Sequence, residues 1–459
     1  MYIEQLYTNC LAEAAYYIES EGQAAVIDPL RETEPYLALA KKRNANIIYV
    51  FETHFHADFV SGHIDLARKA NAKIVYGPEA ETSYEIYRAK DKETFQIGKL
   101  KIEVLHTPGH TPESSCYLLY DEGGKPQAIF TGDTLFVGDV GRPDLLDGVI
   151  SRDELASMLF DSLHTKIKTL PDDVIVYPAH GPGSACGKNI GKETFSTIGN
   201  QKKFNYALQD MSREEFIKQV TEGILPPPQY FFEDARINKE GYDSLENVIK
   251  ENMQPLSTKQ MNEAIKKGAV ILDTRKADDF EKGFIAGAVN IGLNGQFAVW
   301  VGTLIDINTP IVLVTDPGRE EESVLRLARI GYEKIEGYLA GGMNGWQGSL
   351  ETVQSIEASA LKEKIADGAI TTDVRKPGEW NAGHVKGAVF LPLADFPGNL
   401  KDLDPSKEYV VHCGGGYRSM TAISIMRNHG FRNLVNVYGG FGAIEKSGVP
   451  VNTQQAVPV

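Results

Sequence analysis

The sequence predicts an α/β protein of about three domains. Its 459 residues exceed the size of one ordinary domain. Short apolar runs, typical of buried strands, alternate with helical stretches along both halves of the chain. In the second half, residues 270–275 and 283–288 return, with similar sequences, at 370–375 and 383–388. This shared offset indicates a duplicated α/β domain with a parallel sheet, because so long a period is a domain and not a solenoid repeat.

Five apolar runs in the first half predict buried strands, and the segments between some of them predict helices. Motifs that carry histidine or aspartate follow the runs directly. We therefore expect these motifs on loops at strand ends, where a rigid scaffold commonly places functional groups. The expected strands are 24–28, 47–51, 73–76, 128–130 and 174–177, and the expected helices include 34–43 and 61–70.

Three consecutive prolines at 226–228 interrupt this pattern, and a polar stretch follows them as far as residue 254. We therefore expect a boundary between the two halves here. The expected divisions are a first domain over residues 1–240, a linker over 241–254, and two copies of a smaller domain over 255–350 and 355–455.

The composition argues against several classes of protein. A formal net charge of −15 disfavours binding to nucleic acid or to an anionic membrane. No apolar run approaches the ~18 residues that span a bilayer, and the N-terminal segment lacks the features of a secretory signal peptide. The four cysteines form no CxxC pair, so we expect no disulfide framework and a cytoplasmic location.

Histidine and aspartate side chains in four motifs predict a metal site in the first domain. The first motif alternates His54, His56 and Asp58, and alternate residues of an extended segment point the same way. Three further motifs each place one such side chain after an apolar run or a tight turn. Imidazole and carboxylate together suit zinc, iron or manganese. The candidate ligands are His54, His56, Asp58, His110, Asp133 and His180.

The four motifs read Thr-His-x-His-x-Asp, Thr-Pro-Gly-His, Thr-Gly-Asp and Ala-His-Gly. They resemble the motifs of the metallo-β-lactamase superfamily, over about residues 1–240, and this resemblance implies an N-terminal αββα fold. In the two-metal members of that superfamily, a histidine directly after the first motif helps to hold the second metal. Phe59 stands at that position here. The resemblance therefore implies one metal instead of two.

Within the superfamily, the chain is similar to the persulfide dioxygenases, which hold one iron with two histidines and one carboxylate. The similarity maps this Fe(II) site, one per chain, onto His54, His110 and Asp133. The other candidate ligands, His56, Asp58 and His180, would orient the iron ligands or bind metal themselves. Arg142 and Lys188 are candidates for binding the acidic groups of a thiol such as glutathione, with an ordinary structural role equally open. Cys186 is a candidate for substrate contact, and a buried inert cysteine is the alternative.

A second motif places Cys413 directly after an apolar run and before three glycines, with Arg418 opening a predicted helix. Such a loop can turn its backbone N–H groups toward an anion. The motif resembles the Cys-x-x-Gly-x-Arg loop of the rhodanese family, and Asp373, Arg375 and Glu379 match that family's upstream signature. The resemblance implies two rhodanese-like domains, with sulfur transfer through a persulfide on Cys413. Arg375 becomes a further candidate for substrate binding.

The first copy departs from the rhodanese pattern at the corresponding loop. Asp316 aligns with Cys413, and Glu321 falls opposite Arg418. Acidic side chains would repel sulfite or thiosulfate. We therefore expect the copy over 255–350 to be inactive, and to pack between the other domains or form an oligomer contact.

Together, the resemblances imply an iron-dependent persulfide dioxygenase joined to a sulfurtransferase. The expected substrates are a low-molecular-weight thiol persulfide and O₂, which give sulfite. Cys413 would interconvert persulfide plus sulfite and thiosulfate, in sulfide detoxification, and fusion would keep sulfite near its acceptor. The alternatives are a thioester hydrolase resembling hydroxyacylglutathione hydrolase and a sulfur carrier without dioxygenase activity. We expect a dimer or tetramer of identical chains, and the identity of the thiol stays open.

Overall fold

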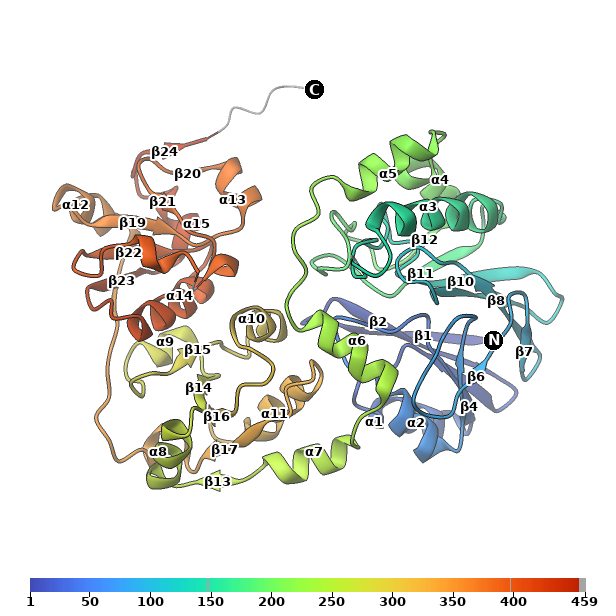
Figure 1. Cartoon of the computed structure of the whole chain (residues 1–459), viewed down its shortest axis with the longest axis horizontal. Coiled ribbons are helices and arrows are strands. Elements are labelled where there is room, and N and C mark those ends of the chain that lie inside the picture. The colour runs from blue at the N-terminus through green and yellow to red at the C-terminus, as the bar shows by residue number, and fades with distance from the viewer. Residues whose placement is uncertain (147, 397, 454–459) are drawn as a thin grey trace. The chain divides into compact units, whose positions relative to one another are not determined.

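The computed structural model describes residues 1–146, 148–396 and 398–453. The chain divides into two compact units (Figure 1). The first unit comprises Met1–Val248 with Ala328–Gly331, and the second comprises Ile249–Leu327 with Tyr332–Val459. Among the described residues, no helix is both long enough and apolar enough to cross a bilayer.

Two six-stranded sheets form the centre of the first unit. In the first sheet, β1 to β3 are antiparallel and β3 to β6 are parallel. The second sheet is antiparallel except for its β10–β11 pair. The first sheet has the order β1 (Tyr2–Thr8), β2 (Glu13–Ser20), β3 (Gln23–Ile27), β4 (Asn46–Phe51), β5 (Lys73–Tyr76) and β6 (Tyr87–Arg88). The second has the order β12 (Ser196–Thr197), β11 (Ile175–Pro178), β10 (Pro126–Gly132), β9 (Ser115–Tyr120), β8 (Leu100–His106) and β7 (Thr94–Ile97).

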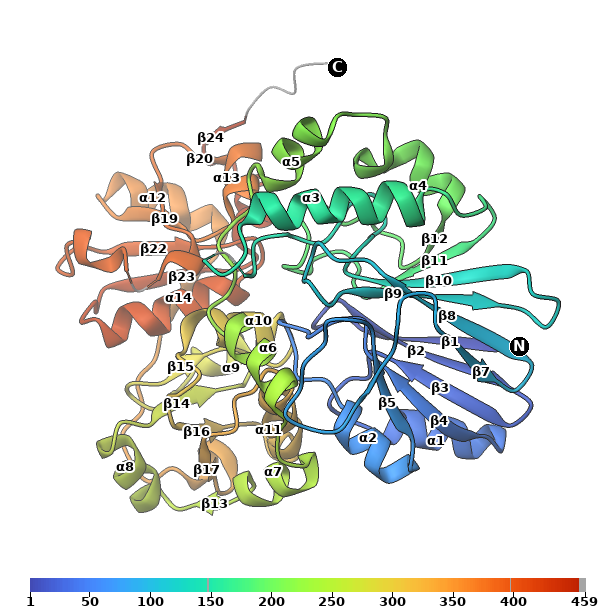
Figure 2. The same cartoon turned by 45° about the vertical axis from the view of Figure 1, so that its right-hand side comes forward.

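The two sheets pack face to face, and helices cover their outer faces (Figure 2). Phe51 of the first sheet and Val104 and Phe130 of the second share one buried core. Helices α1 (Glu34–Arg43) and α2 (His63–Ala70) pack on the outer face of the first sheet. The outer face of the second sheet is covered by α3 (Arg152–Ser162), η1 (Leu163–Ile167), α4 (Ile198–Phe204), η2 (Tyr206–Leu208) and α5 (Arg213–Thr221). The predicted αββα layers are therefore confirmed.

Two more helices follow the proline run of the first unit. They are α6 (Phe231–Glu240) and α7 (Leu245–Asn252). Helix α7 lies within residues 241–254, for which we expected a linker. Helix α6 carries Asn238, whose buried side chain amide donates to the backbone carbonyls of His56 and Phe59, both at 2.8 Å. The segment after the prolines therefore helps to fix the loop that bears the first metal motif.

Two parallel five-stranded sheets organise the second unit. Their strands follow the same spatial order, as the sequence repeat predicts. The first sheet is β13 (Pro255–Leu256), β17 (Ile335–Leu339), β16 (Ile311–Val314), β14 (Val270–Asp273) and β15 (Val289–Asn290). The second is β18 (Gln354–Ile356), β23 (Leu434–Val437), β22 (Tyr409–His412), β19 (Ile370–Asp373) and β21 (Val389–Phe390). β20 (His384–Val385) and β24 (Val451–Asn452) form a separate antiparallel pair.

Helices lie between the strands of both sheets, and the central strands β16 and β22 are buried along their whole lengths. The first copy contains α8 (Thr258–Lys266), α9 (Ala277–Phe280), α10 (Phe297–Leu304), α11 (Glu320–Ala328) and η3 (Gly342–Gly345). The second contains η4 (Ala358–Ala360), α12 (Leu361–Ala366), α13 (Pro377–Ala382), η5 (Leu393–Asp395), η6 (Leu400–Asp402), α14 (Tyr417–Asn428) and α15 (Gly440–Ile444).

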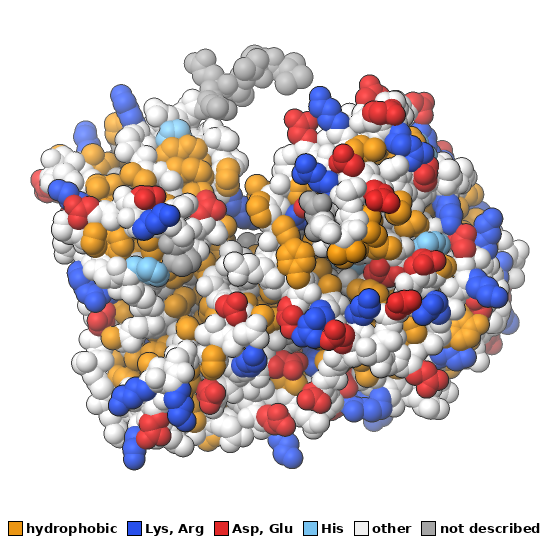
Figure 3. Space-filling view, viewed as in Figure 1, with side chains coloured by type: hydrophobic (Ala, Val, Ile, Leu, Met, Phe, Trp, Pro, Cys, Tyr) orange, Lys and Arg blue, Asp and Glu red, His pale blue; other side chains and the backbone are white. Residues whose placement is uncertain are grey.

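Charged side chains of both signs are interspersed on the face drawn in Figure 3. This face shows no continuous basic surface of the kind that binds nucleic acid.

Candidate metal centre and catalytic loop

The predicted metal ligands meet at the ends of the central strands of the first unit. His54 follows β4, Asp133 follows β10 and His180 follows β11, while His110 lies in the turn between β8 and β9. All four side chains are at most 2% exposed. The strand-end loops therefore bring together residues that are far apart in the sequence.

His54, His110 and Asp133 form one group of possible ligand atoms, all within 4.8 Å of one another. The Oδ2 atom of Asp133 lies 3.9 Å from Nε2 of His54 and 3.5 Å from Nε2 of His110. None of these three atoms has a hydrogen-bond partner, although all are buried. Burying polar atoms without partners is costly, and a cation between them would satisfy all three. The residues therefore fit a metal.

Hydrogen bonds at the other nitrogen of each ring fix the tautomers of the two histidines. The Thr53 hydroxyl donates to Asp28 Oδ2 at 2.8 Å, so it accepts from Nδ1–H of His54 at 2.9 Å. Nδ1–H of His110 donates to the carbonyl of Arg142 at 2.8 Å. Each Nε2 therefore keeps its lone pair for a metal. Burial, together with the neighbouring histidines, holds the pKa of His54 well below its usual range, which favours the neutral ligand form.

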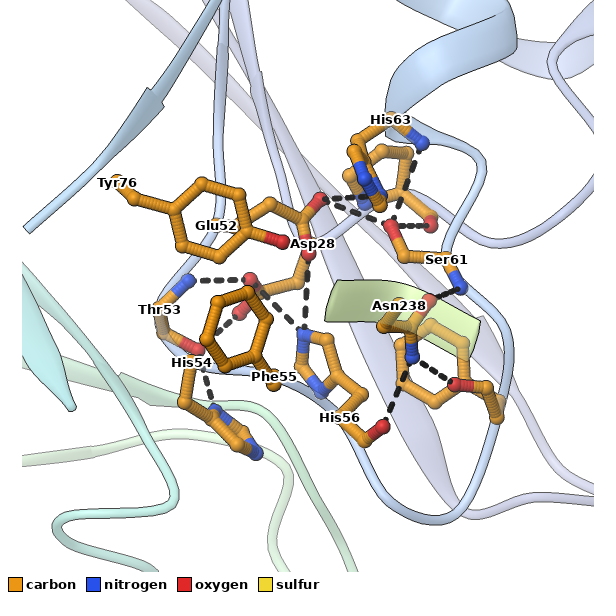
Figure 4. A network of polar contacts seen from close by, with 12 residues as sticks. Asp28, Glu52, Thr53, His54, Phe55, His56, Ser61, His63, Tyr76 and Asn238 are labelled. Carbon is orange, nitrogen blue, oxygen red and sulfur yellow. Dashed lines mark hydrogen bonds and ion pairs between the residues drawn. The ribbon is translucent and has the colours of Figure 1, made fainter. Parts of the chain in front are cut away.

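His56 faces a different set of side chains (Figure 4). Its Nε2 atom lies 3.1 Å from Asp28 Oδ1 and 3.6 Å from Glu52 Oε2. Asp28 also accepts from the backbone N–H of Thr53 at 2.7 Å, so one carboxylate restrains both motif histidines. Burial and the charge of Asp28 raise the pKa of Glu52 well above its usual range. His56 thus directs its ring nitrogen to the two carboxylates.

Asp58, His180 and Cys186 lie on the other side of Asp133. Nε2 of His180 is 3.5 Å from Asp133 Oδ1 and 3.4 Å from Asp58 Oδ2, and Cys186 completes this group. Burial opposes protonation of His180, but the two carboxylates outweigh it and raise its pKa well above the usual range. Burial, with the same carboxylates, raises the pKa of Cys186 to about 12, so this thiol is neutral near pH 7.

Phe59 is fully buried, and its ring centroid lies 4.4 Å from that of His56. Its side chain offers no atom that can bind a metal. The position next to the first motif is therefore occupied by an apolar ring packed on His56.

The three predicted substrate-binding cations have protein partners. Arg142 pairs with Asp144 and donates to two backbone carbonyls. The ammonium of Lys188 donates to the carbonyls of Gln219 and Glu222. Arg375 is buried against Asp373, over the ring of Phe441, and donates to the carbonyl of Gly383. The role of these three cations in substrate binding stays a prediction.

Cys413 lies at the end of β22, in a loop that directs a backbone N–H toward its sulfur. The N–H of Gly416, a glycine with φ +105°, donates to Cys413 Sγ at 3.1 Å. Arg418 forms a bidentate pair with Glu379, at 2.5 and 2.8 Å. A side chain on Gly440 would place Cβ 2.3 Å from the Cys413 carbonyl, so the backbone can approach the loop only at a glycine.

Several residues of the site were not predicted from the sequence. Asp28 and Glu52 directly follow β3 and β4, as the predicted ligands follow their strands, so their positions carried a usable signal. The role of Asn238 had no such signal, because it lies on a helix 182 positions after His56. The ion pair between Arg418 and Glu379 had no such signal either, because only the fold brings the two side chains together.

Comparisons with known proteins agree with this architecture. A family model described as the metallo-beta-lactamase superfamily matches residues 8–180, and a rhodanese-like domain model matches 257–349 and 357–447. The human protein "Persulfide dioxygenase ETHE1, mitochondrial" is 32% identical over 213 residues, which cover 45% of this chain and 74% of that protein. The chain belongs to the metallo-β-lactamase superfamily. Two rhodanese-like domains follow in its second half, as predicted.

Similarity also extends to a hydrolase and to a solved structure. A hydroxyacylglutathione hydrolase from Tolumonas auensis is 34% identical over 169 residues, covering 36% of this chain and 60% of that enzyme. A crystal structure of a metallo-beta-lactamase from Staphylococcus aureus subsp. aureus COL is 32% identical, with a TM-score of 0.65. The match covers 74% of this chain and 99% of that one. Sequence identity alone therefore does not distinguish a dioxygenase from a hydrolase, and the residues of the site are needed for that distinction.

Proposed function

We propose that the first unit is an Fe(II)-dependent persulfide dioxygenase and that the last domain is a sulfurtransferase. The observation that carries the first part is the convergence of His54 Nε2, His110 Nε2 and a carboxylate oxygen of Asp133, all buried without a hydrogen-bond partner. His56 directs its ring nitrogen to Asp28 and Glu52, and Phe59 offers no ligand atom. Two histidines and one carboxylate leave open positions, an arrangement typical of non-haem Fe(II) oxygenases.

The overall reaction is RSSH + O₂ + H₂O → RSH + SO₃²⁻ + 2H⁺. When bound, Fe(II) would supply the redox chemistry between the persulfide sulfur and O₂. The chain's own residues hold and orient this centre. Thr53 and the Arg142 carbonyl fix the two imidazole tautomers, and Asp28 fixes Thr53. The three ligand side chains are buried, which limits their contact with bulk water.

Sulfur transfer would proceed through Cys413. Its thiolate attacks the outer sulfur of RSSH, forming a Cys413 persulfide while the original S–S bond breaks and releases RS⁻. Sulfite then attacks the outer sulfur of that persulfide, giving thiosulfate, H⁺ and the free thiolate. The Gly416 N–H that points at Sγ would stabilise the thiolate in both steps.

The rival function is a thioester hydrolase like the similar hydroxyacylglutathione hydrolases. Hydrolysis of this type favours a hydroxide held between two metals. Asp58, His180 and Cys186 lie together beside Asp133, but Phe59 supplies no ligand atom there and His56 is directed to Asp28 and Glu52. The apolar side chain at position 59 therefore argues against the two-metal hydrolase.

Metal analysis of anaerobically purified protein tests the proposed centre. We expect one iron per chain, and loss of that iron in Asp133→Ala. Two zinc ions per chain, with no iron bound after reconstitution, would contradict the proposal and favour the hydrolase.

A further inference from the structure

The first rhodanese-like domain contacts the helix that carries the catalytic loop of the second. Tyr417, Ser424 and Asn428 are spaced so that they share one face of α14. The Tyr417 hydroxyl donates to the Gly292 carbonyl at 2.8 Å, and the Asn428 amide donates to the Gly287 carbonyl at 3.0 Å. Between them, the hydroxyl of Ser424 accepts from the backbone N–H of Asn290 at 3.0 Å.

These partners lie on or beside one edge strand of the first domain. β15 is the last strand of its sheet, so one row of its backbone groups has no neighbouring strand. Unpaired edges are usually protected in native proteins. Here the Asn290 N–H on that edge donates a hydrogen bond to the Ser424 hydroxyl of α14. The contact is therefore a directed docking of one repeat on the other.

The two domains pack most tightly at the end of this contact nearest Cys413. Tyr417 directly follows the three loop glycines and directly precedes Arg418. A Cβ on Gly295 would lie 2.5 Å from the Tyr417 ring, so the ring occupies the space that a side chain there would need. Burial raises the pKa of the Tyr417 phenol, which keeps the hydroxyl a hydrogen-bond donor.

The glycine loop is held on one side, where the Phe441 N–H donates to the Cys413 carbonyl at 2.6 Å and Gly440 approaches Gly414 closely. A Cβ added to Gly415 or Gly416 would meet nothing within 4 Å, so packing does not hold these residues on the side where that Cβ would lie. Glycine also loses more conformational freedom than any other residue when it is ordered. Tyr417 is the first side chain after the glycines, and its hydroxyl anchors the end of the loop that leads into α14.

We infer that the first rhodanese-like domain is a positioning domain for the catalytic loop of the second, with Tyr417 as the positioning residue. Its anchor on Gly292 holds the start of α14, and thereby holds the Gly416 N–H on Cys413 Sγ and Arg418 on Glu379. The inference rests on the proposed role of Cys413. It gives a role to a domain whose own loop has Asp316 where a cysteine is needed.

Alkylation of Cys413 in the full-length protein tests the inference. Iodoacetate is an anion and iodoacetamide is neutral, so the ratio of their rates at Cys413 reports how well the loop N–H groups and Arg418 favour an anion. The rates are read by mass spectrometry of the Cys413 peptide at one pH. We expect Tyr417→Phe, which keeps the ring, to lower this ratio about threefold or more, in line with the loss of a hydrogen bond.

Tyr332→Phe is the matched control, because the Tyr332 hydroxyl also donates to a backbone carbonyl, that of Ile305, inside the first domain. We expect it to leave the ratio unchanged. Gly295→Ala, which alters only the first domain, should lower the ratio as Tyr417→Phe does. An unchanged ratio in folded Tyr417→Phe and Gly295→Ala, or an equal fall in Tyr332→Phe, would overturn the inference.

Sulfur transfer from thiosulfate to cyanide is measured in parallel. Absence of transfer by the wild-type protein would refute the proposed function of Cys413. The alkylation ratio would still report on positioning, so the two failures are distinguishable.

Discussion

At the residue scale, the direction of each imidazole decides which atoms can hold a metal. The Nδ1 atoms of His54 and His110 are engaged by Thr53 and a backbone carbonyl, which frees both Nε2 atoms. His56 lies only two positions from His54 but directs its Nε2 to Asp28 and Glu52. In the proposed centre, the same motif would therefore supply one ligand and one orienting side chain.

Thr53→Val tests the link between Asp28 and His54. The substitution keeps the shape of a buried side chain but removes the hydroxyl that accepts from His54 Nδ1–H. We expect iron affinity to fall about 10- to 100-fold, as is common when a partner of a metal ligand is lost. Thr53→Ser keeps the hydroxyl and serves as the control. Equal iron affinity in Thr53→Val and wild type, by competition titration, would show that the bond has no orienting role.

At the element scale, loops at the ends of strands carry both sites. The histidine and aspartate motifs could be predicted because each follows an apolar run in the sequence. Asp28 and Glu52 could have been found by the same rule, since they follow β3 and β4. The contacts of Asn238 could not be predicted, because they join segments that lie 179 or more positions apart. The Tyr417–Gly292 contact could not be predicted either, because its partners lie 125 positions apart and meet only through the packing of a helix. The local sequence therefore predicts where each functional loop lies, but the contacts that hold the loop come from segments far away in the sequence.

Gly440→Ala tests how closely two loops of the last domain approach each other. Gly440 has φ +52°, and a Cβ there would lie 2.3 Å from the Cys413 carbonyl. Gly448 has φ +79°, but a Cβ there would meet nothing within 4 Å. We expect Gly440→Ala to lower the free energy of unfolding by about 1–3 kcal/mol more than Gly448→Ala does, because it adds overpacking to backbone strain. Equal denaturation midpoints for the two variants would contradict this account of the loop.

At the scale of the whole molecule, the proposed function joins two chemistries with a shared metabolite in one chain. Sulfite would be the product of the first unit and a substrate of the last domain. The metal group and Cys413 lie in different compact units, and no side chain serves both sites in the described residues. The activities should therefore be separable by mutation, although fusion raises the local concentration of sulfite.

Cys413→Ser tests this separation through the products. Given only glutathione persulfide and O₂, the wild-type protein should form thiosulfate, because sulfite is captured by the Cys413 persulfide. The variant should accumulate sulfite at an undiminished rate of O₂ uptake. The products are separated by ion chromatography. A parallel loss of O₂ uptake in the folded variant would show that the two sites are not independent.

The central claim, that His54, His110 and Asp133 hold one iron for persulfide oxidation, is tested most directly by O₂ uptake. Iron-loaded protein is placed in an oxygen electrode with glutathione, coenzyme A or cysteine persulfide. We expect uptake of one O₂ per persulfide oxidised in Cys413→Ser, with no uptake by Asp133→Ala. Absence of uptake by folded, iron-loaded protein with every persulfide, together with hydrolysis of a glutathione thioester, would contradict this claim.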